Sequence, residues 1–457
     1  MGKRMSVFGS NYATKTALSR SKNTSYTSLT CVAEGGGYLV NMNKSYIGLI
    51  DCNNFFVSCE RLFRPDLENK PVVVLSSNDG CVVARSQEIK DIGIPMGVPY
   101  FQVKDKLSEI KTAVFSSHFA LYRDISRRIF NLVMQEVAVF EQYSIDEAFF
   151  ILRDTNPQQA ALSLKTYVER CVGVPVSVGI AATKTQAKYA NETTKRKSGA
   201  WYMSQDIFAR QAVDIPLYSI WGVGAGRSQA LAKHGLQTVA DLCAADRARV
   251  QRLFGIEGAR LQAELSGQAA YKVSPRRVPQ QSIMSSRSFR APSTKKAVVE
   301  DALAYHIRLA TADLRAQGQV ASVVQVLLRP SRHGIYALRG GSGSVTLEQP
   351  TNDTFEILHE ATRLLRALFE PAVPYQKVGI VLSGLKPAGT TQLTLYQDTA
   401  KSGRPQLFRA IDAVNTRYGQ DTLRIGSAIA ARTWQAKCDQ LSPAYTTRWS
   451  DLKTVVA

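Results

Sequence analysis

From Tyr46 onward, short apolar runs alternate with segments whose apolar residues recur every three or four positions. The runs YIGLI, AFFIL and VPVSVGIA are predicted strands, and the amphipathic segment 119–137 is a predicted helix. With residues 54–117 treated as an insertion, the order is strand–helix–strand–strand–helix–strand, which is typical of the ferredoxin-like split unit. The insertion holds two more predicted strands, PVVVLS and CVVARS, the second leading into a helix through Lys90.

Two adjacent carboxylates, Asp146 and Glu147, interrupt the predicted hairpin EQYSIDEAFFIL (residues 141–152). Burying an ionised carboxylate is costly unless a cation compensates it, and a bend at this pair turns both towards one divalent cation. Asp51 closes the first strand, beside the hairpin in the split unit. Taken singly, the pair fits a solvent-exposed turn and Asp51 fits a helix N-cap. Together the three acids are the minimum set for two Mg²⁺ ions about 3.5–4 Å apart, the general device for in-line displacement at phosphorus.

The strand 174–181 runs into a basic segment, ATKTQAKYANETTKRKSG. This segment lacks the second glycine of a phosphate-binding P-loop. One interpretation of its basic residues is a solvated helix face. The alternative is that they contact a triphosphate or a nucleic-acid backbone, because they follow a core strand opposite the acids. They are Lys184, Lys188, Lys195, Arg196 and Lys197.

Two further regions have the character of binding modules. Residues 219–242 (SIWGVGAGRSQALAKHGLQTVADL) follow the helix–hairpin–helix pattern, whose backbone N–H groups hold a phosphate without reading bases; a plain helix–loop–helix is the alternative. After a linker at 274–279, a second strand–helix–strand–strand–helix–strand unit has no acidic pair at its hairpin. Candidate DNA contacts in the two regions are Gly222, Gly224, Gly226, Arg227, Arg287, Arg290 and Arg329, and Arg332 and Arg339 also lie on or beside the strands of the second unit.

Composition favours a nucleic-acid partner. The 457 residues include 57 Lys and Arg against 37 Asp and Glu, a formal charge of +20, which points to a polyanion. The seven cysteines show no C-x-x-C pair and no zinc spacing, so we expect reduced thiols and a cytoplasmic, nucleoid-associated protein. No apolar run reaches the roughly 20 residues of a membrane span. Residues 1–44 are polar, and we expect little ordered structure there, with Met42 as an alternative start.

Taken in order, these stretches resemble the Y-family DNA polymerases of the UmuC type. The resemblance is carried by GLIDCNNFFVSCE, FRPDLENKPVVVLSSNDGCVVARSQEIK, FSSHFALYRDISRRI, YSIDEAFF, VGIAATKTQAKYAN, WGVGAGRSQALAKHG, QLTLY and SPAYTTRWSDL. It implies an α+β right-hand polymerase with a ferredoxin-like palm, small fingers, a helix–hairpin–helix thumb and a βαββαβ little finger. The implied boundaries are an extension at 1–45, palm at 46–54 and 117–202, fingers at 55–116, thumb at 203–273, little finger at 280–385 and a tail at 386–457.

The resemblance also implies roles for single residues. Asp51, Asp146 and Glu147 become ligands of two Mg²⁺ ions, with Mn²⁺ able to substitute, and the Cys52 carbonyl adds an oxygen. Phe56 falls at the steric gate that excludes ribonucleotides, with Phe55 beside it. Lys188 matches the lysine that contacts the incoming triphosphate. Gln87 and Lys90 stand where many relatives have Tyr and Arg, so the grip of the fingers on the triphosphate is weaker in this reading.

The tail carries the resemblance to partner-binding segments. QLTLY, which is Gln392, Leu393, Thr394, Leu395 and Tyr396, resembles a sliding-clamp peptide, and SPAYTTRWSDL resembles the C-terminal segment of UmuC-type proteins. The latter implies a processed UmuD-type dimer and the RecA filament as partners.

The function expected from all of this is error-prone, template-directed extension of a DNA primer from deoxynucleoside triphosphates. It would act in translesion synthesis and the SOS response, without a proofreading domain. A nucleotidyl cyclase or metal-dependent nuclease, and a non-enzymatic DNA-binding scaffold, are the alternatives.

Overall fold

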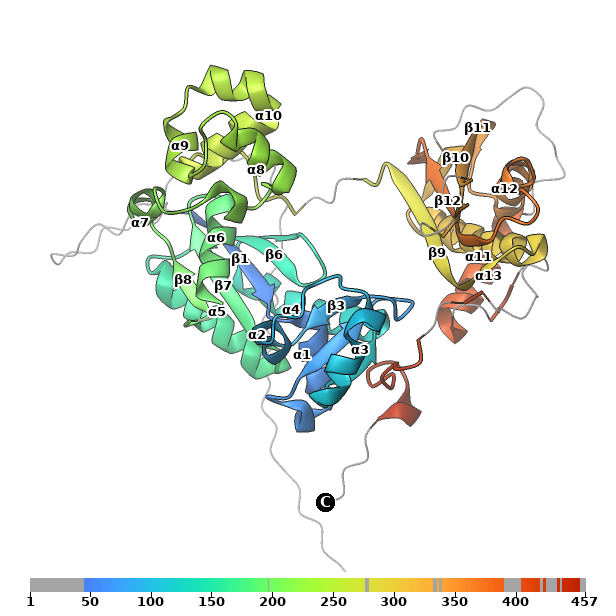
Figure 1. Cartoon of the computed structure of the whole chain (residues 1–457), viewed down its shortest axis with the longest axis horizontal. Coiled ribbons are helices and arrows are strands. Elements are labelled where there is room, and N and C mark those ends of the chain that lie inside the picture. Colours follow the sequence, from blue (N-terminus) through green and yellow to red (C-terminus); the bar gives the residue numbers. More distant parts are fainter. Residues whose placement is uncertain are drawn as a thin grey trace, which may run out of the picture. The chain divides into compact units, whose positions relative to one another are not determined.

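Five strands between residues 45 and 202 form one sheet, here called the catalytic sheet, in the order β5-β6-β1-β7-β8 (Figure 1). The structure is a computed structural model and describes residues 45–195, 197–275, 279–331, 335–336, 339–389, 404–419, 422–424, 434–435 and 438–452. The predicted split unit is confirmed, because β6 lies between β1 and β5 and neighbouring strands in the order β5-β6-β1-β7 are antiparallel. A fifth strand, β8, pairs in parallel with β7 and was not predicted. The elements are β1 (Ser45–Cys52), α4 (Phe119–Glu136), β5 (Val139–Gln142), β6 (Glu147–Arg153), α5 (Pro157–Val172), β7 (Val176–Ala181) and β8 (Ala200–Tyr202).

Both faces of the catalytic sheet are covered by helices, which explains its uninterrupted apolar runs. Ile50 and Phe150 point into the core formed with α4 and α5. Their neighbours Leu49 and Phe149 point to the other face, where they pack against Ala187 of α6 (Lys184–Thr194). Successive side chains of a strand alternate between faces, so a strand covered on both sides is apolar throughout.

The insertion between β1 and α4 forms a smaller, three-stranded sheet in the order β3-β2-β4. The two predicted strands are β2 and β3, and the helix predicted to run through Lys90 is α2; β4, parallel to β2, was not predicted. The elements are α1 (Phe55–Phe63), η1 (Pro65–Leu67), β2 (Val72–Leu75), β3 (Val82–Arg85), α2 (Gln87–Asp91), α3 (Tyr100–Glu109) and β4 (Ala113–Ser116).

Residues 205–265 are helical and contain the predicted glycine turn. Gly222 has a φ of 86°, a left-handed conformation that favours glycine, and α8 begins just after Gly224. The predicted His-Gly break falls at Gly235, with a φ of 78°, and Thr238 and Asp241 form a capping box at the start of α9. The elements are α7 (Gln205–Gln211), η2 (Leu217–Ser219), α8 (Ala225–Ala232), α9 (Val239–Ala244) and α10 (Arg247–Leu265).

The second unit has the predicted order of elements but a different strand pairing. Its sheet runs β11-β10-β12-β9, so the last strand, β12, lies between the first two; in the catalytic sheet the third strand takes that place. Apolar periodicity shows which face of a strand is buried but does not show which strands it pairs with. The sequence therefore could not distinguish the two arrangements. The elements are β9 (Ser282–Ser293), α11 (Lys296–Ala316), β10 (Gln319–Pro330), β11 (Gly341–Thr351), α12 (Thr354–Leu368) and β12 (Tyr375–Ser383).

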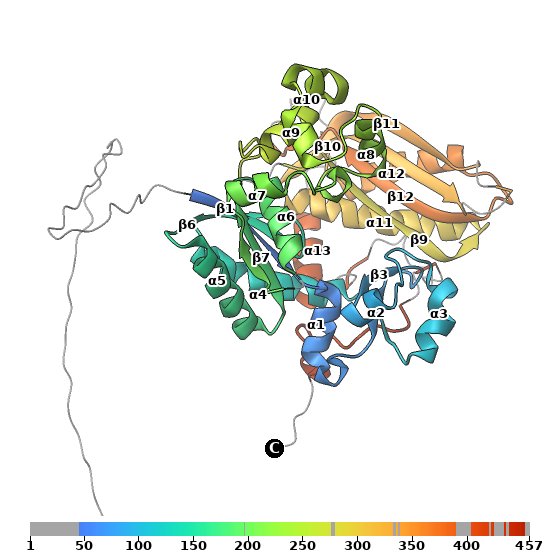
Figure 2. The same cartoon turned by 60° about the vertical axis from the view of Figure 1, so that its left-hand side comes forward.

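Described parts of the C-terminal region, which the sequence suggested to be a loose tail, form regular elements and defined contacts. β13 (Lys386–Pro387) pairs with β10, and Asp412 of α13 (Arg404–Tyr418) forms a bidentate ion pair with Arg315 at 2.7 and 2.9 Å. Residues 438–452, which include η5 (Trp449–Asp451), contact α1 through Ser442 and Tyr445 (Figure 2). Among the described residues, none of the helices combines the length and apolarity needed to cross a membrane.

We predict that Gly179→Ala destabilises the protein by about 2 kcal/mol or more. An added Cβ at this position of β7 would lie 2.3 Å from the Asn191 nitrogen and 2.4 Å from the Ala187 oxygen, both backbone atoms of α6. Because backbone cannot rotate away, α6 must shift, and thermal unfolding should begin several degrees lower. Gly226→Ala is the control, since its Cβ meets nothing within 4 Å. Equal unfolding temperatures for the two variants would contradict the close packing of α6.

Candidate active site

Three carboxylates converge where β1 ends, on the α6 face of the catalytic sheet. Asp51 and Glu147 are directly paired across β1 and β6, so their side chains share a face. Glu192 of α6 joins them, and one oxygen of each of the three lies within 4.8 Å of the others. The sequence reasoning missed Glu192, because it is the one acid in a run of bases and its approach to Asp51 depends on how α6 packs.

Asp146, the other half of the predicted pair, lies in the turn before β6. Its backbone carbonyl accepts from Cys52 N at 2.9 Å, and its carboxylate accepts from the Ser144 hydroxyl at 2.5 Å. The Ser144 oxygen in turn accepts the backbone N–H groups of Asp146 and Glu147, which fixes the turn. The structure therefore brings Asp51 and Glu147 together, while Asp146 lies beside Cys52 and is held by its own turn.

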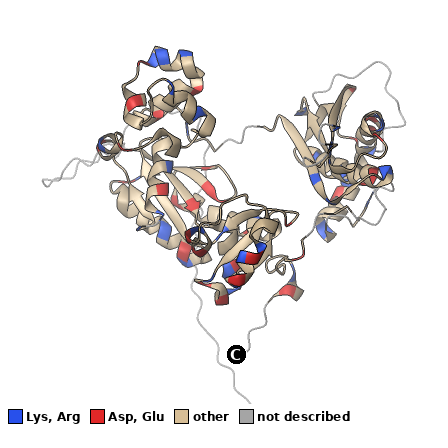
Figure 3. Cartoon of the chain, in the orientation of Figure 1, with Lys and Arg blue, Asp and Glu red and all other residues tan. Residues whose placement is uncertain are grey.

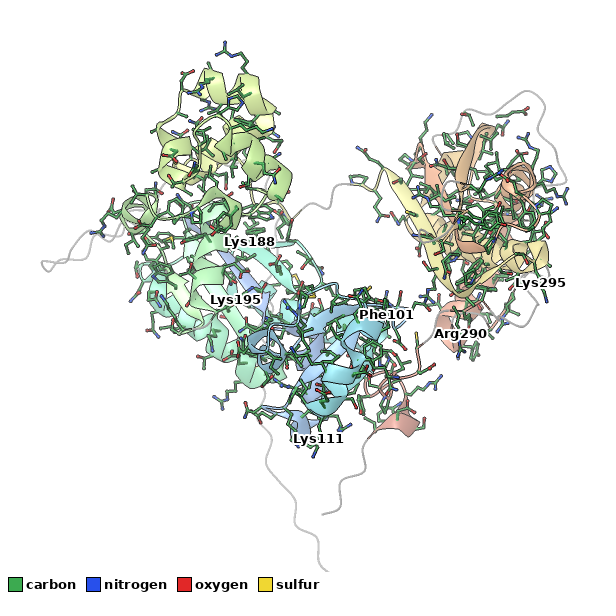
Figure 4. The ribbon with its side chains drawn as sticks, in the orientation of Figure 1. Phe101, Lys111, Lys188, Lys195, Arg290 and Lys295 are labelled. Carbon is green, nitrogen blue, oxygen red and sulfur yellow. The ribbon has the colours of Figure 1, made fainter. Side chains whose placement is uncertain are left out.

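Two lysines on and just beyond α6, labelled in Figure 4, partly neutralise these acids. The Lys188 ammonium donates to both oxygens of Glu147 at 2.8 Å and lies over the rings of Tyr143 and Trp221. The Lys195 ammonium lies 3.1 Å from Asp51 and 2.6 Å from Glu192. A third base of the predicted set, Lys184, is buried in a bidentate pair with Glu141 and has a structural role.

Burial disfavours the charged form of the Asp51 carboxyl even with Lys195 beside it. The pKa of this carboxyl is raised to about 7, chiefly by burial and also by the neighbouring Glu147, although Lys195 acts to lower it. Only 7% of Asp51 is exposed. A buried carboxyl with a pKa near neutrality gains from any added cation that keeps it ionised. The carboxylate oxygens are the ligands that hard divalent cations prefer, so the residues present fit such an ion.

A cleft of about 720 Å³ opens from the acids towards the smaller sheet. It contains two of the predicted nucleotide-binding residues, Gln87 and Lys90 of α2, and Lys90 donates to Asn54 at its rim. Lys195 lines the cleft, whereas Lys188, the predicted triphosphate contact, is paired with Glu147. The lining residues are Asp51, Asn53, Asn54, Gln87, Lys90, Asp91, Pro175, Glu192 and Lys195.

The two adjacent aromatic residues of α1 are in different environments. Phe55 is buried in the core, with 3% of its surface exposed. Phe56 is half-buried and stacks on Tyr122, with ring centroids 4.4 Å apart. A larger hollow of about 910 Å³ near Gln280 and Gln317 has no ionisable side chain in its lining, so the chemistry belongs to the cleft at Asp51.

Comparison with known proteins identifies the family. A sequence model of the impB/mucB/samB family matches residues 50–192, and that of the impB/mucB/samB family C-terminal domain matches residues 280–395. A domain of unknown function (DUF4113) matches residues 405–455. Protein UmuC of Salmonella typhimurium (strain LT2) is 34% identical over 420 residues, which cover 89% of this chain and 99% of that protein. Protein ImpB of Salmonella typhimurium is 33% identical, over 88% of this chain and 98% of that protein.

The chain belongs to the impB/mucB/samB family of Y-family DNA polymerases. DNA polymerase IV of Caulobacter vibrioides is 28% identical, over 84% of this chain and 94% of that protein. A solved Y-family DNA polymerase chimera of Dbh and Dpo4 superposes with a TM-score of 0.61 at 17% identity, over 75% of this chain and 99% of that one, which shows the right-hand fold. The predicted enzyme class, a DNA-directed DNA polymerase for error-prone translesion synthesis in the SOS response to DNA damage, is confirmed, and the cyclase, nuclease and scaffold alternatives fall away.

In this Y-family polymerase the predicted DNA contacts lie on two surfaces. In the glycine turn at 222–226 every residue except Val223 is exposed, and Trp221 just before it is half-buried. Arg227 donates to the Gly222 carbonyl at 2.8 Å. Exposed bases continue over the neighbouring helices (Figure 3): Lys233, Arg247, Arg249, Arg252 and Arg260.

The arginines of the second sheet divide between its two faces. Arg329 pairs with Lys377 across β10 and β12, and Arg290 follows Phe289 on β9, so these bases lie on the face that α11 and α12 leave open. Arg287 is paired with the buried Val378, so its position is on the face of the sheet that the helices cover. It is nevertheless exposed, and β9 is an edge strand of the sheet. Arg196, Arg332 and the clamp-type peptide at 392–396 lie outside the described residues.

We predict that Lys195→Ala raises the KM for deoxynucleoside triphosphates and lowers kcat/KM by roughly 10- to 100-fold, the loss expected for one hydrogen bond to a charged group. Because Lys195 lowers the pKa of Asp51, its removal should also move the acid limb of the pH–rate profile to higher pH. Steady-state primer extension between pH 6 and 9 measures both effects. Lys197→Ala, an exposed lysine two positions on, is the matched control. Equal kinetics for the two variants would remove Lys195 from the nucleotide site.

Proposed function

We propose that the cleft beside Asp51 holds a deoxynucleoside triphosphate and that the three acids there direct its transfer to a DNA primer. The observation that carries this proposal is the pairing of Asp51 with Glu147 on the α6 face, with two lysine ammoniums beside them. The primer 3′-oxygen forms a bond to the α-phosphorus, the bond from that phosphorus to the pyrophosphate breaks, and the hydroxyl proton is released. The template strand selects the nucleotide by base pairing.

Asp51, Glu147 and Asp146, with the Cys52 carbonyl, are the proposed ligands of two Mg²⁺ ions, for which Mn²⁺ substitutes. When bound, such ions activate the attacking oxygen and stabilise charge on the leaving group. Glu192 is a further candidate ligand, because its carboxylate belongs to the same group of oxygens. The acids are held in place before any cation arrives, by the β1–β6 register and by Ser144.

The chain's own cations bind and orient the triphosphate. Lys195 and Lys90 both line the cleft, so both can neutralise phosphate oxygens. Lys188, which grips Glu147, is placed to hold that carboxylate and to exchange with an incoming phosphate oxygen. As in phosphoryl transfer generally, the protein supplies position and charge.

Phe56 is the proposed steric gate, with its ring beneath the sugar of the incoming nucleotide. Its half-buried position supports this role, whereas the fully packed Phe55 belongs to the core. Gln87 lines the cleft, and its amide donates to Asp91 at 2.6 Å. A 2′-hydroxyl that meets an aromatic ring has neither space nor a hydrogen-bond partner, which disfavours ribonucleotides.

Duplex DNA is the proposed partner of the glycine turn with Arg227, and of Arg287, Arg290 and Arg329. These groups contact phosphates, so binding weakens steeply with salt. The remaining proposals come from the resemblance: a sliding clamp on Gln392, Leu393, Leu395 and Tyr396, and a processed UmuD-type dimer and the RecA filament as partners. A cytoplasmic, nucleoid-associated location agrees with these partners.

We predict that Asp51→Asn, Asp146→Asn and Glu147→Gln each reduce Mg²⁺-dependent nucleotide incorporation by at least about 100-fold, because each removes charge that the reaction needs. Primer extension on a defined template measures incorporation, and a gel-shift assay checks that duplex binding is kept. Asp154→Asn, an exposed acid beyond the far end of β6, is the matched control and should extend primers normally. Incorporation that survives in Asp51→Asn would overturn the assignment of the site.

We predict that Phe56→Ala lowers the discrimination between deoxyribonucleotides and ribonucleotides by at least about tenfold, because it opens space for the 2′-hydroxyl. The measurement is the ratio of kcat/KM for a matched pair such as dATP and ATP. Phe101→Ala, an aromatic residue of α3 with 76% of its surface exposed, is the control. An unchanged ratio in Phe56→Ala would mean that another residue guards the sugar.

A further inference from the structure

The C-terminal segment, residues 438–452, packs into the hydrophobic core that α1 and α4 share with the catalytic sheet. Gln440 pairs with Ser116 at the end of β4, in both directions: its carbonyl accepts from the Ser116 N–H at 2.9 Å and its N–H donates to the Ser116 hydroxyl at 3.0 Å. Tyr445 stacks on Phe63 of α1, with ring centroids 4.5 Å apart and planes inclined by 9°, and is 6% exposed. This segment falls in the part of the chain matched by the domain of unknown function.

Ser442, the next contact along the segment, enters a buried polar cluster. Its hydroxyl donates to Glu60 Oε1 at 3.1 Å, and its oxygen lies 3.1 Å from His118 Nδ1, which donates to it in the matching tautomer. Ser442, Glu60 and His118 are all buried, and Glu60 has no exposed surface.

Glu60 depends on few partners. Among the described residues, Glu60 Oε2 has no hydrogen-bond partner, and Oε1 accepts only from Ser442 and from the Tyr122 hydroxyl, at 2.7 Å. Burial raises the pKa of the carboxyl. A buried carboxyl with so few donors is sensitive to the loss of either, because each removes a large share of its compensation.

Tyr122 connects this cluster to the proposed steric gate. Its hydroxyl is held by Glu60, and its ring stacks on Phe56 with centroids 4.4 Å apart and planes inclined by 14°. Tyr122 is fully buried, and Phe119 meets the Phe56 ring edge-on at 5.9 Å. Phe56 and Glu60 are four residues apart on α1, hence on one face of that helix. The position of the Phe56 ring is thus set by Tyr122, and that of Tyr122 by Glu60.

We propose that the docked C-terminal segment sets the sugar selectivity of the polymerase, with Ser442, Glu60 and Tyr122 acting as positioning residues for Phe56. This inference rests on the steric-gate role proposed above for Phe56. It assigns to the domain of unknown function a task in the polymerase reaction itself, in addition to any partner that it binds.

The test is the full-length Ser442→Ala variant in primer extension with paired deoxyribonucleotides and ribonucleotides. We expect discrimination to fall about fivefold to tenfold, the loss of one buried hydrogen bond. The change should appear chiefly as a lower KM for the ribonucleotide, because kcat for the deoxyribonucleotide depends on the acids. Ser442→Thr keeps the hydroxyl and should restore selectivity. Ser450→Ala, in the same segment and exposed, is the matched control and should match the wild type.

The outcomes separate this inference from the proposals beneath it. If the wild-type chain extends no primer, the proposed reaction is wrong. If Phe56→Ala leaves the sugar selectivity unchanged, the proposed gate role of Phe56 is wrong. If Phe56→Ala loses selectivity while Ser442→Ala keeps it, the positioning role alone is wrong. Tyr122→Phe, which keeps the stacked ring and removes the hydroxyl, is the second variant: it should also lose selectivity, and wild-type selectivity there would overturn the proposal even if Ser442→Ala fails to fold. A loss in Ser450→Ala equal to that in Ser442→Ala would likewise overturn it.

Discussion

The register between β1 and β6 is the constraint on which the active site depends. Side chains alternate along a strand, so a slip of one residue would send Asp51 to the opposite face of the catalytic sheet, away from α6. Gly48 and Phe150 are paired in this register, and a Cβ at Gly48 would lie 2.1 Å from the Phe150 ring. The glycine thus leaves room for the ring only in the observed alignment. The sheet fixes where the acids point before any ligand is bound.

The same packing delivers the positive charges. Gly179 lets the backbone of α6 approach β7 closely, and this brings Lys188 to Glu147 and Lys195 to Asp51. Three acids, Asp51, Glu147 and Glu192, and two lysines therefore share a small, partly buried volume. In such a setting each charge depends strongly on its neighbours, which is why burial raises the pKa of Asp51 to about 7. A site with unbalanced negative charge is suited to cations and to a substrate that arrives with them.

The sequence predicted the strand order of the catalytic sheet, because its hairpin and its two crossover helices have clear apolar periods. It named Lys188 for the triphosphate, whereas Lys195 is the lysine of this segment that lines the cleft. These residues are seven positions apart, so both lie on one face of a helix; about 10 Å of helix separates them, and only the packing of α6 against β1 shows which one reaches the cleft. Glu192 was missed for the same reason. The strand pairing of the second sheet was also beyond reach, since both possible orders bury the same apolar residues.

The contacts of the C-terminal segment could not be predicted from the sequence for a different reason, which also concerns how the polymerase is held together. Ser442 and Glu60 are separated by 382 residues, and no periodicity connects residues so far apart. What joins them is the cost of a buried carboxyl: Glu60 has to collect donors from wherever the chain can bring them, and it obtains one from α4 and one from the C-terminal segment. The buried Glu60 carboxyl therefore connects α1, α4 and the C-terminal segment, which no sequence pattern relates to one another. Because the α4 donor is Tyr122, whose ring stacks on Phe56, the same requirement reaches the proposed steric gate.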